Sequence, residues 1–294
     1  MDNVTETTSA CVQSAGPDGD ITLLGIIEAE ISAGNVELPP LPEIAVRLQE
    51  LIANDGDIAA IAALISREPA YAAAILRYAN SVAFAGLKQI ADLQQATARL
   101  GLKAVEQTVL AISARQAFQA RNASDERIFR ALWNHSLATA LAARRLATKA
   151  VGTELAFLAG LLHDVGKVVV LRCAADLRTQ NPERFGFAEP VLLEFLDELH
   201  CRVGDAFLAS WNIPLEVREA CRRHHDATFG PDDLLPAIVA CADLVAAKLG
   251  ASLRPRPDAH ILESAAASAL RLDDVRLANL LIDVEDDLER FNDL

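Results

Sequence analysis

The chain has 294 residues, enough for one large or two modest domains with real hydrophobic cores. Its formal net charge of −14 argues against broad binding to nucleic acid or to anionic membranes, because both favour basic surfaces. Apolar residues make up 52 % and aromatic residues 5 %, with alanine and leucine prominent, and this bias favours packed helices over a sheet.

Several features predict a cytoplasmic protein that does not cross a membrane. Uninterrupted apolar runs such as Ile58–Ile65 reach only eight residues, whereas a spanning helix needs ~20. The first residues lack the basic and apolar regions of a secretory signal. Five cysteines are scattered without any CxxC pattern, which is typical of reduced thiols in a cytosol.

The chain begins with a polar tail, residues 1–20, that we expect to be disordered. Apolar residues then recur at helical spacing from Ile21 to Ala33. The prolines of Leu38–Pro42 indicate a stiff extended connector. A ligand for a proline-binding module is the alternative interpretation, and a rigid entry into the next helix is the one we favour.

Helical patterns follow closely up to residue 122, and we assign residues 21–122 to an N-terminal helical subdomain. Asp57 resembles an N-cap residue, Pro69 suits a first helical turn, and Asp92 or Leu93 begins a further helix. Asn80–Ser81 could be read as catalytic, but a helix C-cap explains it better, because asparagine tolerates the left-handed conformation. No useful segment alternates with a period of two residues, so the sequence predicts an all-α fold without a sheet of three strands.

A polar break at Asn122–Glu126 opens a second helical subdomain, residues 123–250, and a C-terminal extension follows at 251–294. We expect a hinge at Arg254–Pro257 and one or two amphipathic helices after it. The acidic, leucine-rich end, Leu280–Leu294, is either a partner or homodimer contact or a helix that packs back on the domain. We favour the second alternative.

The second half is organised around Leu155–Lys167, an apolar helical run that ends in the pair His163–Asp164. Gly166 follows where a helix C-cap glycine is expected. Five of the six histidines lie between residues 135 and 225, and Asp243 follows on another apolar helix. One buried histidine is most often bonded to a backbone carbonyl, but several in this order favour a shared cavity. The candidate residues are His135, His163, Asp164, His200, His224, His225 and Asp243.

Several short motifs resemble the HDOD domain, an HD-related output domain of bacterial signalling proteins. The N-terminal ones are Leu38–Pro42, Arg67–Ala70, Ile75–Ser81 and Ala96–Gly101, with Glu68 where the family usually has aspartate. The C-terminal ones are Trp133–Ser136, Gly160–Gly166, His200–Gly204 and Trp211–Pro214. The resemblance covers residues 36–250 and implies an HD-superfamily-like second subdomain packed on the first.

The resemblance also implies roles for the candidate residues. His135, His163, Asp164 and Asp243 would form the core ligand set of a divalent metal such as Fe, Mn, Zn or Mg. His200, His224 and His225 match the additional histidines of the two-metal HD branch. If the chain is catalytic, Asp164 and Lys167 would take part, with Lys167 facing a phosphate.

One feature argues against cleavage of cyclic dinucleotides. The stretch after His225, Asp226–Pro236, lacks the G-Y-P signature of those phosphodiesterases. It carries Asp232 and Asp233, which would repel a phosphodiester if they faced the cavity. Arg222, Arg223 and Lys167 could offset this repulsion, which would allow binding without cleavage.

We therefore expect a regulatory protein that acts through contact with signalling proteins or by sensing a small ligand, such as a nucleotide. The metal site would be retained or vestigial. The alternative is a metal-dependent phosphohydrolase that acts on a nucleotide or cyclic nucleotide.

Overall fold

The computed structural model describes residues 25, 26, 29, 33, 40–80, 88–120, 122, 123, 125–186 and 188–292. Within this part of the chain every regular element is a helix and none is a strand, which confirms the predicted all-α class. None of these helices combines the length and the apolar character needed to cross a bilayer. The predicted tail at 1–20 and most of the predicted helix at 21–33 lie outside the described residues.

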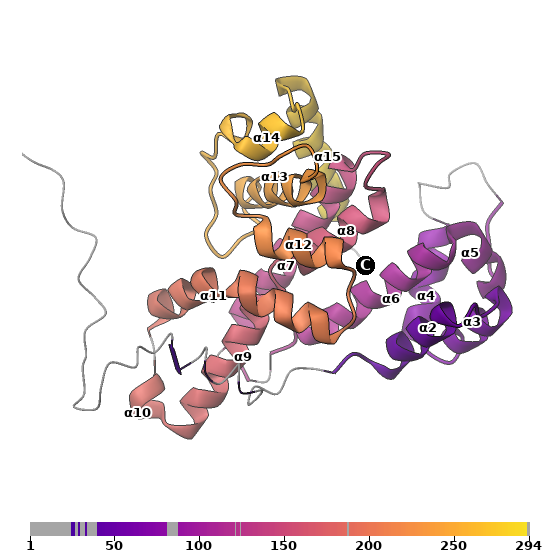
Figure 1. The fold of residues 1–294 in the computed structure, drawn as a ribbon, viewed down its shortest axis with the longest axis horizontal. Coiled ribbons are helices and arrows are strands. Elements are labelled where there is room, and N and C mark those ends of the chain that lie inside the picture. The colour runs from indigo at the N-terminus through magenta and orange to yellow at the C-terminus, as the bar shows by residue number, and fades with distance from the viewer. Residues whose placement is uncertain are drawn as a thin grey trace, which may run out of the picture.

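The first group of helices, coloured indigo to magenta in Figure 1, lies to one side of the molecule. It comprises α2 (Glu43–Ala53), α3 (Ile58–Ile65), α4 (Pro69–Ala79), α5 (Leu93–Leu100) and α6 (Leu102–Ala117). The expected helix starts are present, because the side chains of Asp57 and Asp92 accept hydrogen bonds from the first turns of α3 and α5, and Pro69 opens α4.

Asn80 ends α4 as predicted, but its φ of −105° is not left-handed. Its side chain instead clamps the chain across the α4–α5 connection. The amide nitrogen donates to the carbonyl of Ile90 at 2.7 Å, and the amide oxygen accepts from the Ile90 N–H at 2.8 Å. This pair of bonds gives Asn80 a structural role, whereas Ser81 lies outside the described residues.

The second group forms the rest of the molecule, in pink to yellow in Figure 1. Its longer helices are α7 (Glu126–Leu146), α8 (Thr153–Leu162), α9 (Val165–Gln180), α11 (Glu189–Ser210), α12 (Leu215–Arg223), α13 (Leu234–Lys248) and α15 (Asp274–Asn292). The short elements are α10 (Pro182–Phe185), η2 (Ile261–Glu263) and α14 (Ala265–Ala269).

Helix α7 is the centre of this group, because α8, α13 and α15 all pack against it, while α9 packs against α11. Helix α8 also contacts α6 and so joins the two groups. A single hydrophobic cluster runs through both, from Ile44 on α2 through Leu162 on α8 to Val284 on α15. The boundaries proposed for the two subdomains stay a prediction.

Two close helix crossings depend on glycine. A Cβ on Gly160 of α8 would lie 2.8 Å from the Cα of Ala140 on α7. A Cβ on Gly166 would lie 2.0 Å from the carbonyl oxygen of His200 on α11. The predicted C-cap role of Gly166 is therefore wrong: α8 already ends at Leu162, and Gly166 lies in the first turn of α9, where only glycine lets α11 approach.

The expected hinge at Arg254–Pro257 is instead an anchored segment. The Arg256 N–H donates to the carbonyl of Ala247 on α13 at 2.9 Å. The ammonium group of Lys248 donates to the carbonyl of Pro257 at 2.8 Å. These bonds fold the segment back over the end of α13, beside the histidine-rich region.

Candidate metal centre

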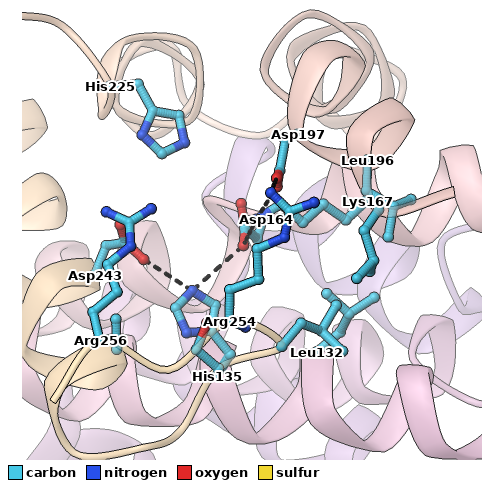
Figure 2. Close-up of a pocket in the computed structure, with 14 residues that line it drawn as sticks. Leu132, His135, Asp164, Lys167, Leu196, Asp197, His225, Asp243, Arg254 and Arg256 are labelled. Carbon is cyan, nitrogen blue, oxygen red and sulfur yellow. Dashed lines mark hydrogen bonds and ion pairs between the residues drawn. The ribbon is translucent and has the colours of Figure 1, made fainter. Parts of the chain in front are cut away.

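The fold brings all seven candidate residues to one place, although they come from five parts of the chain. His135 comes from the middle of α7, and His163 and Asp164 form the junction between α8 and α9. His200 comes from α11, the pair His224–His225 follows α12, and Asp243 comes from α13. Figure 2 shows His135 lying between the carboxylates of Asp164 and Asp243, with His225 above them.

A first donor group consists of His135, His163, Asp164 and Asp243. The Nε2 atom of His135 lies 3.0 Å from Asp243 Oδ1 and 3.4 Å from Asp164 Oδ2. The Nε2 atoms of His135 and His163 are 3.2 Å apart. Donors held ~2.1 Å from one ion lie ~3.0–3.4 Å from each other in octahedral or tetrahedral geometry, so these spacings suit a common ion.

A second donor group consists of His200, His224 and His225. The Nε2 of His200 lies 3.4 Å from that of His224 and 3.2 Å from that of His225. Asp164 links the two groups, because its Oδ2 faces the first while its Oδ1 lies 3.4 Å from His200 Nε2. A carboxylate between two sets of nitrogen donors is suited to bridging two ions.

Backbone carbonyls hold four of the imidazoles in place. The Nδ1 atoms of His135 and His163 lie 2.8 and 2.7 Å from the carbonyl oxygens of Ala251 and Gly160. His200 and His224 have equivalent bonds to carbonyls of Leu196 and Cys221 at 2.9 and 2.8 Å. A carbonyl can only accept, so each Nδ1 carries hydrogen, and Nε2 becomes the ligand atom directed into the site.

Burial and mutual attraction fix the charges of the ion-free site. Burial lowers the pKa of His163 to about 4 and favours the neutral ring. Burial acts on His135 in the same direction, but hydrogen bonds with Asp164 and Asp243 outweigh it and raise its pKa to about 10. Two carboxylates are thus balanced by two cations, His135 and Lys167, whose Nζ lies 2.7 Å from Asp164 Oδ2.

The residues present fit a divalent metal. Asp164 Oδ1 is buried and accepts no hydrogen bond from the described residues, although burying an unpaired carboxylate oxygen is costly. Burial raises the pKa of Asp164, but the charge of Lys167, the hydrogen bond with His135 and the other neighbouring histidines together outweigh it. They hold this pKa well below its usual range, so the group is an anion. Together with neutral imidazoles, such a donor set suits Zn²⁺, Mn²⁺ or Fe²⁺. That these residues bind a metal stays a prediction.

A cavity of about 380 Å³ opens onto the first donor group. Its walls include Lys167 and two arginines that the sequence analysis did not identify, Arg254 and Arg256. In Figure 2 the Arg254 side chain extends from the segment after α13 toward Asp197 on α11, and the two form an ion pair at 2.7 Å. The prolines of Arg254–Pro257 predict only a hinge, and nothing in the local sequence indicates that its two arginines reach the cavity.

The acidic residues expected to oppose a phosphodiester do not line this cavity. Asp233 is paired with Arg223, which also binds Asp226 at 2.8 Å. Arg222 is directed to Glu219. These ion pairs therefore lie outside the cavity, and the lysine and arginine side chains that line it are Lys167, Arg254 and Arg256.

Comparison with protein families adds a direct assignment. The HDOD domain family matches residues 38–227, well over half of the chain. The chain belongs to the HDOD family. The HDOD match ends before α13, so Asp243 and the two arginines of the cavity lie beyond it and are brought to the site by the packing of α13 against α7.

Similar proteins include an uncharacterized protein of Treponema pallidum (strain Nichols), which is 29% identical over 211 residues. These residues are 69% of this chain and 40% of the relative, so the chain spans well under half of that protein.

Two solved structures share the HDOD fold seen here. One is a protein of Shewanella amazonensis provisionally assigned as a metal-dependent phosphohydrolase, with 21% identity and a TM-score of 0.68 over 89% of this chain and 98% of that one. The other is an HDOD domain protein of unknown function from Geobacter sulfurreducens, with 22% identity and a TM-score of 0.64 over 90% and 94%. At these identities the likeness establishes the fold.

Proposed function

We propose that this HDOD protein is a regulatory protein of the cytoplasm whose metal-holding cavity binds a phosphate-bearing small molecule, such as a nucleotide. Binding of this ligand would then be communicated to a signalling protein through direct contact. The observation that carries the proposal is the cavity itself, which is lined both by the proposed metal donors His135, Asp164 and Asp243 and by the cations Lys167, Arg254 and Arg256.

The size and lining of the cavity suit such a ligand. A volume of about 380 Å³ lies within the range of small-molecule sites. Guanidinium groups bind phosphate through two parallel hydrogen bonds, and an ammonium group contributes a point charge. Apolar side chains of Leu132, Leu196 and Leu253 complete the walls and offer surface to a base or sugar.

The arrangement favours binding over turnover. Asp197 pairs with Arg254 at 2.7 Å and lies 3.7 Å from Lys167, so two of the three cations are engaged with one carboxylate. A phosphate would have to replace Asp197 at both. The G-Y-P signature of the cyclic dinucleotide phosphodiesterases is also absent from Asp226–Pro236. Metal donors without such orienting groups leave much of a reaction barrier in place.

A metal-dependent phosphohydrolase is the second candidate, and the bridging position of Asp164 between two donor groups favours it. Bound ions would supply an acidified water and polarise a phosphoryl oxygen. In this chain Lys167 would neutralise charge on the phosphate, and the four carbonyl-held imidazoles would keep the donors in place.

The test is calorimetry on metal-reconstituted protein with inorganic phosphate, mononucleotides, cyclic mononucleotides and cyclic dinucleotides, followed by chromatography of the same mixtures for products. We expect at least one phosphate compound to bind only in the presence of metal. Replacing Arg254→Ala should weaken that binding by about 10- to 100-fold, since a hydrogen bond to a charged group contributes ~1.5–3 kcal/mol. The exposed Arg47→Ala on α2 should leave it unchanged.

Failure of every phosphate compound to bind at millimolar concentration would overturn the proposal. Turnover of a phosphate compound that Asp164→Ala abolishes would instead favour the phosphohydrolase function over the regulatory one.

A further inference from the structure

A cysteine that no motif identified lies beside the second donor group. Cys201 follows His200 on α11 and is partly buried, and its Sγ lies 3.3 Å from His200 Nε2. Neighbouring residues on a helix point ~100° apart, yet both side chains reach the same point. One donor atom each from His200, Cys201, His224 and His225 lies within 4.8 Å of all the others.

An independent observation marks the same point as a place for a cation. Asp164 Oδ1 faces the group from α9, at 3.4 Å from His200 Nε2 and 3.8 Å from His224 Nε2. This oxygen is buried, and it accepts no hydrogen bond from the described part of the chain. A buried carboxylate oxygen that accepts no hydrogen bond and is directed at two of the three imidazoles is an arrangement that a positive ion would stabilise.

The other cysteines near the core have different surroundings. Cys221 is fully buried, and its thiol donates to the carbonyl of His163 at 3.1 Å, so it is used as a backbone partner. Cys241 is also fully buried, within the apolar α13. Cys201 differs from both because its sulfur contacts a ring nitrogen of a candidate metal ligand.

We propose that Cys201 is a thiolate ligand of the metal in the second donor group, which thereby becomes a three-histidine, one-cysteine site. The inference rests on the metal-holding part of the proposed function and is independent of what the cavity binds. Histidine nitrogen and cysteine sulfur are typical ligands of Zn²⁺, and a soft sulfur selects Zn²⁺ or Fe²⁺ over Mg²⁺. The first donor group offers only nitrogen and oxygen, so the two positions differ in the metals they prefer.

Coordination would change one bond at the sulfur. Without an ion the thiol carries its proton, as an ordinary cysteine does at neutral pH. Binding then breaks the S–H bond, forms the sulfur–metal bond and releases the proton to solvent, with no change of oxidation state.

Cobalt substitution tests the assignment without an activity assay. The full chain is stripped with a chelator and reconstituted with Co²⁺, whose bond to a thiolate gives a charge-transfer absorption in the near ultraviolet. We expect this band in the wild-type protein and in Cys241→Ala, the matched buried control. The band should vanish in Cys201→Ala and Cys201→Ser. The zinc affinity of the second donor group should fall by at least about 10- to 100-fold, the loss that follows even from changes to residues that only orient metal ligands.

The outcomes separate this inference from the proposed function. Bound cobalt without the band in the wild-type protein, or a band that persists in Cys201→Ser, would overturn the thiolate assignment and leave the metal site standing. Absence of any bound cobalt, zinc or iron would overturn both. Thermal unfolding followed by circular dichroism identifies any variant that fails to fold, and Cys201→Ser, the smaller change, then decides the result.

Discussion

Each carbonyl-bound histidine of the site uses its two ring nitrogens differently. Taken singly, a buried imidazole bonded to a backbone carbonyl is an ordinary structural feature, and the Nδ1 atoms of His163 and His224 have such bonds. Their Nε2 atoms, however, lie 3.5 and 3.8 Å from oxygens of Asp164. The structural and the ligand interpretations of these histidines are therefore compatible, because the carbonyl bond is what directs the second nitrogen into the site.

At this scale we predict that the metal-free protein loses stability between pH 6.5 and about 4. Burial lowers the pKa of His163 to about 4 and lowers the pKa values of His200 and His224 as well. In that range the unfolded chain therefore binds more protons than the folded chain, and the free energy of unfolding falls as the pH falls. Each pKa unit corresponds to about 1.4 kcal/mol.

Urea titrations of chelator-treated protein at pH 6.5 and pH 5 measure this effect. The raised pKa of His135 lowers stability mainly as the pH rises from 6.5 toward about 10, so a comparison that starts at pH 6.5 leaves most of this opposing contribution out. His163→Gln should show a smaller difference between the two pH values, and the exposed His260→Gln should match the wild type. An identical pH dependence in wild type and His163→Gln would contradict the prediction.

The junction between α8 and α9 is the element that the site depends on most. The chain ends one helix at Leu162, places His163 and Asp164 in the turn, and begins the next helix at Val165. Gly166 then lets the backbone of α11 pass close by, next to His200. The same glycine thus sets how closely α11, which carries His200, approaches the Asp164 carboxylate.

We predict that Gly166→Ala destabilises the protein by about 3 kcal/mol or more, at the upper end for overpacking, because the new Cβ meets backbone atoms on α11. The matched control is Gly230→Ala, where the nearest atom is a side-chain oxygen of Asp233 at 3.5 Å. In urea denaturation, the midpoint of Gly166→Ala should be lower than that of the wild type, and the midpoint of Gly230→Ala should be nearly unchanged. Equal midpoints would show that α11 can move away at little cost.

At the scale of the whole molecule, the C-terminal extension packs back on the helix that carries His135. Helix α15 contacts α7, and Val284 on it is fully buried in the common cluster. Arg145 on α7 adds ion pairs to Asp287 at 2.8 Å and Asp283 at 3.3 Å. The structure thus favours the packed-back alternative for this helix, while a homodimer through its outer face stays a proposal.

We predict that Val284→Asp destabilises the protein by about 3–5 kcal/mol, because it buries a charge without a partner. Ile282, two residues earlier, is 59% exposed, and Ile282→Asp should change stability by less than about 0.5 kcal/mol. For the wild type and both variants, the midpoint of urea unfolding is measured, and the molar mass is measured by light scattering. Wild-type stability of Val284→Asp would mean that α15 does not cover the core in solution.

The sequence by itself determined the fold class and most helix starts, and it predicted seven of the residues that meet at the candidate site. Helical periodicity and side-chain caps such as Asp57 and Asp92 are local features that need no long-range contact. The order of the histidines and aspartates was informative because it could be compared with a family. The local pattern gave a wrong prediction at Gly166. A glycine near a helix end has the same sequence pattern whether it caps the helix or allows another helix to pack closely against it.

Only the tertiary structure decided which atoms meet. Arg254, Arg256 and Cys201 carry no periodicity or motif, and their place in the site follows from how α13 packs on α7 and how α11 crosses α9. The tertiary structure also shows where the Asp233 side chain points. Asp233 pairs with Arg223 across a turn, and residue spacing in the sequence does not predict the shape of that turn. Contacts between distant segments depend on the summed packing of the whole core, so they become visible only when the chain is folded.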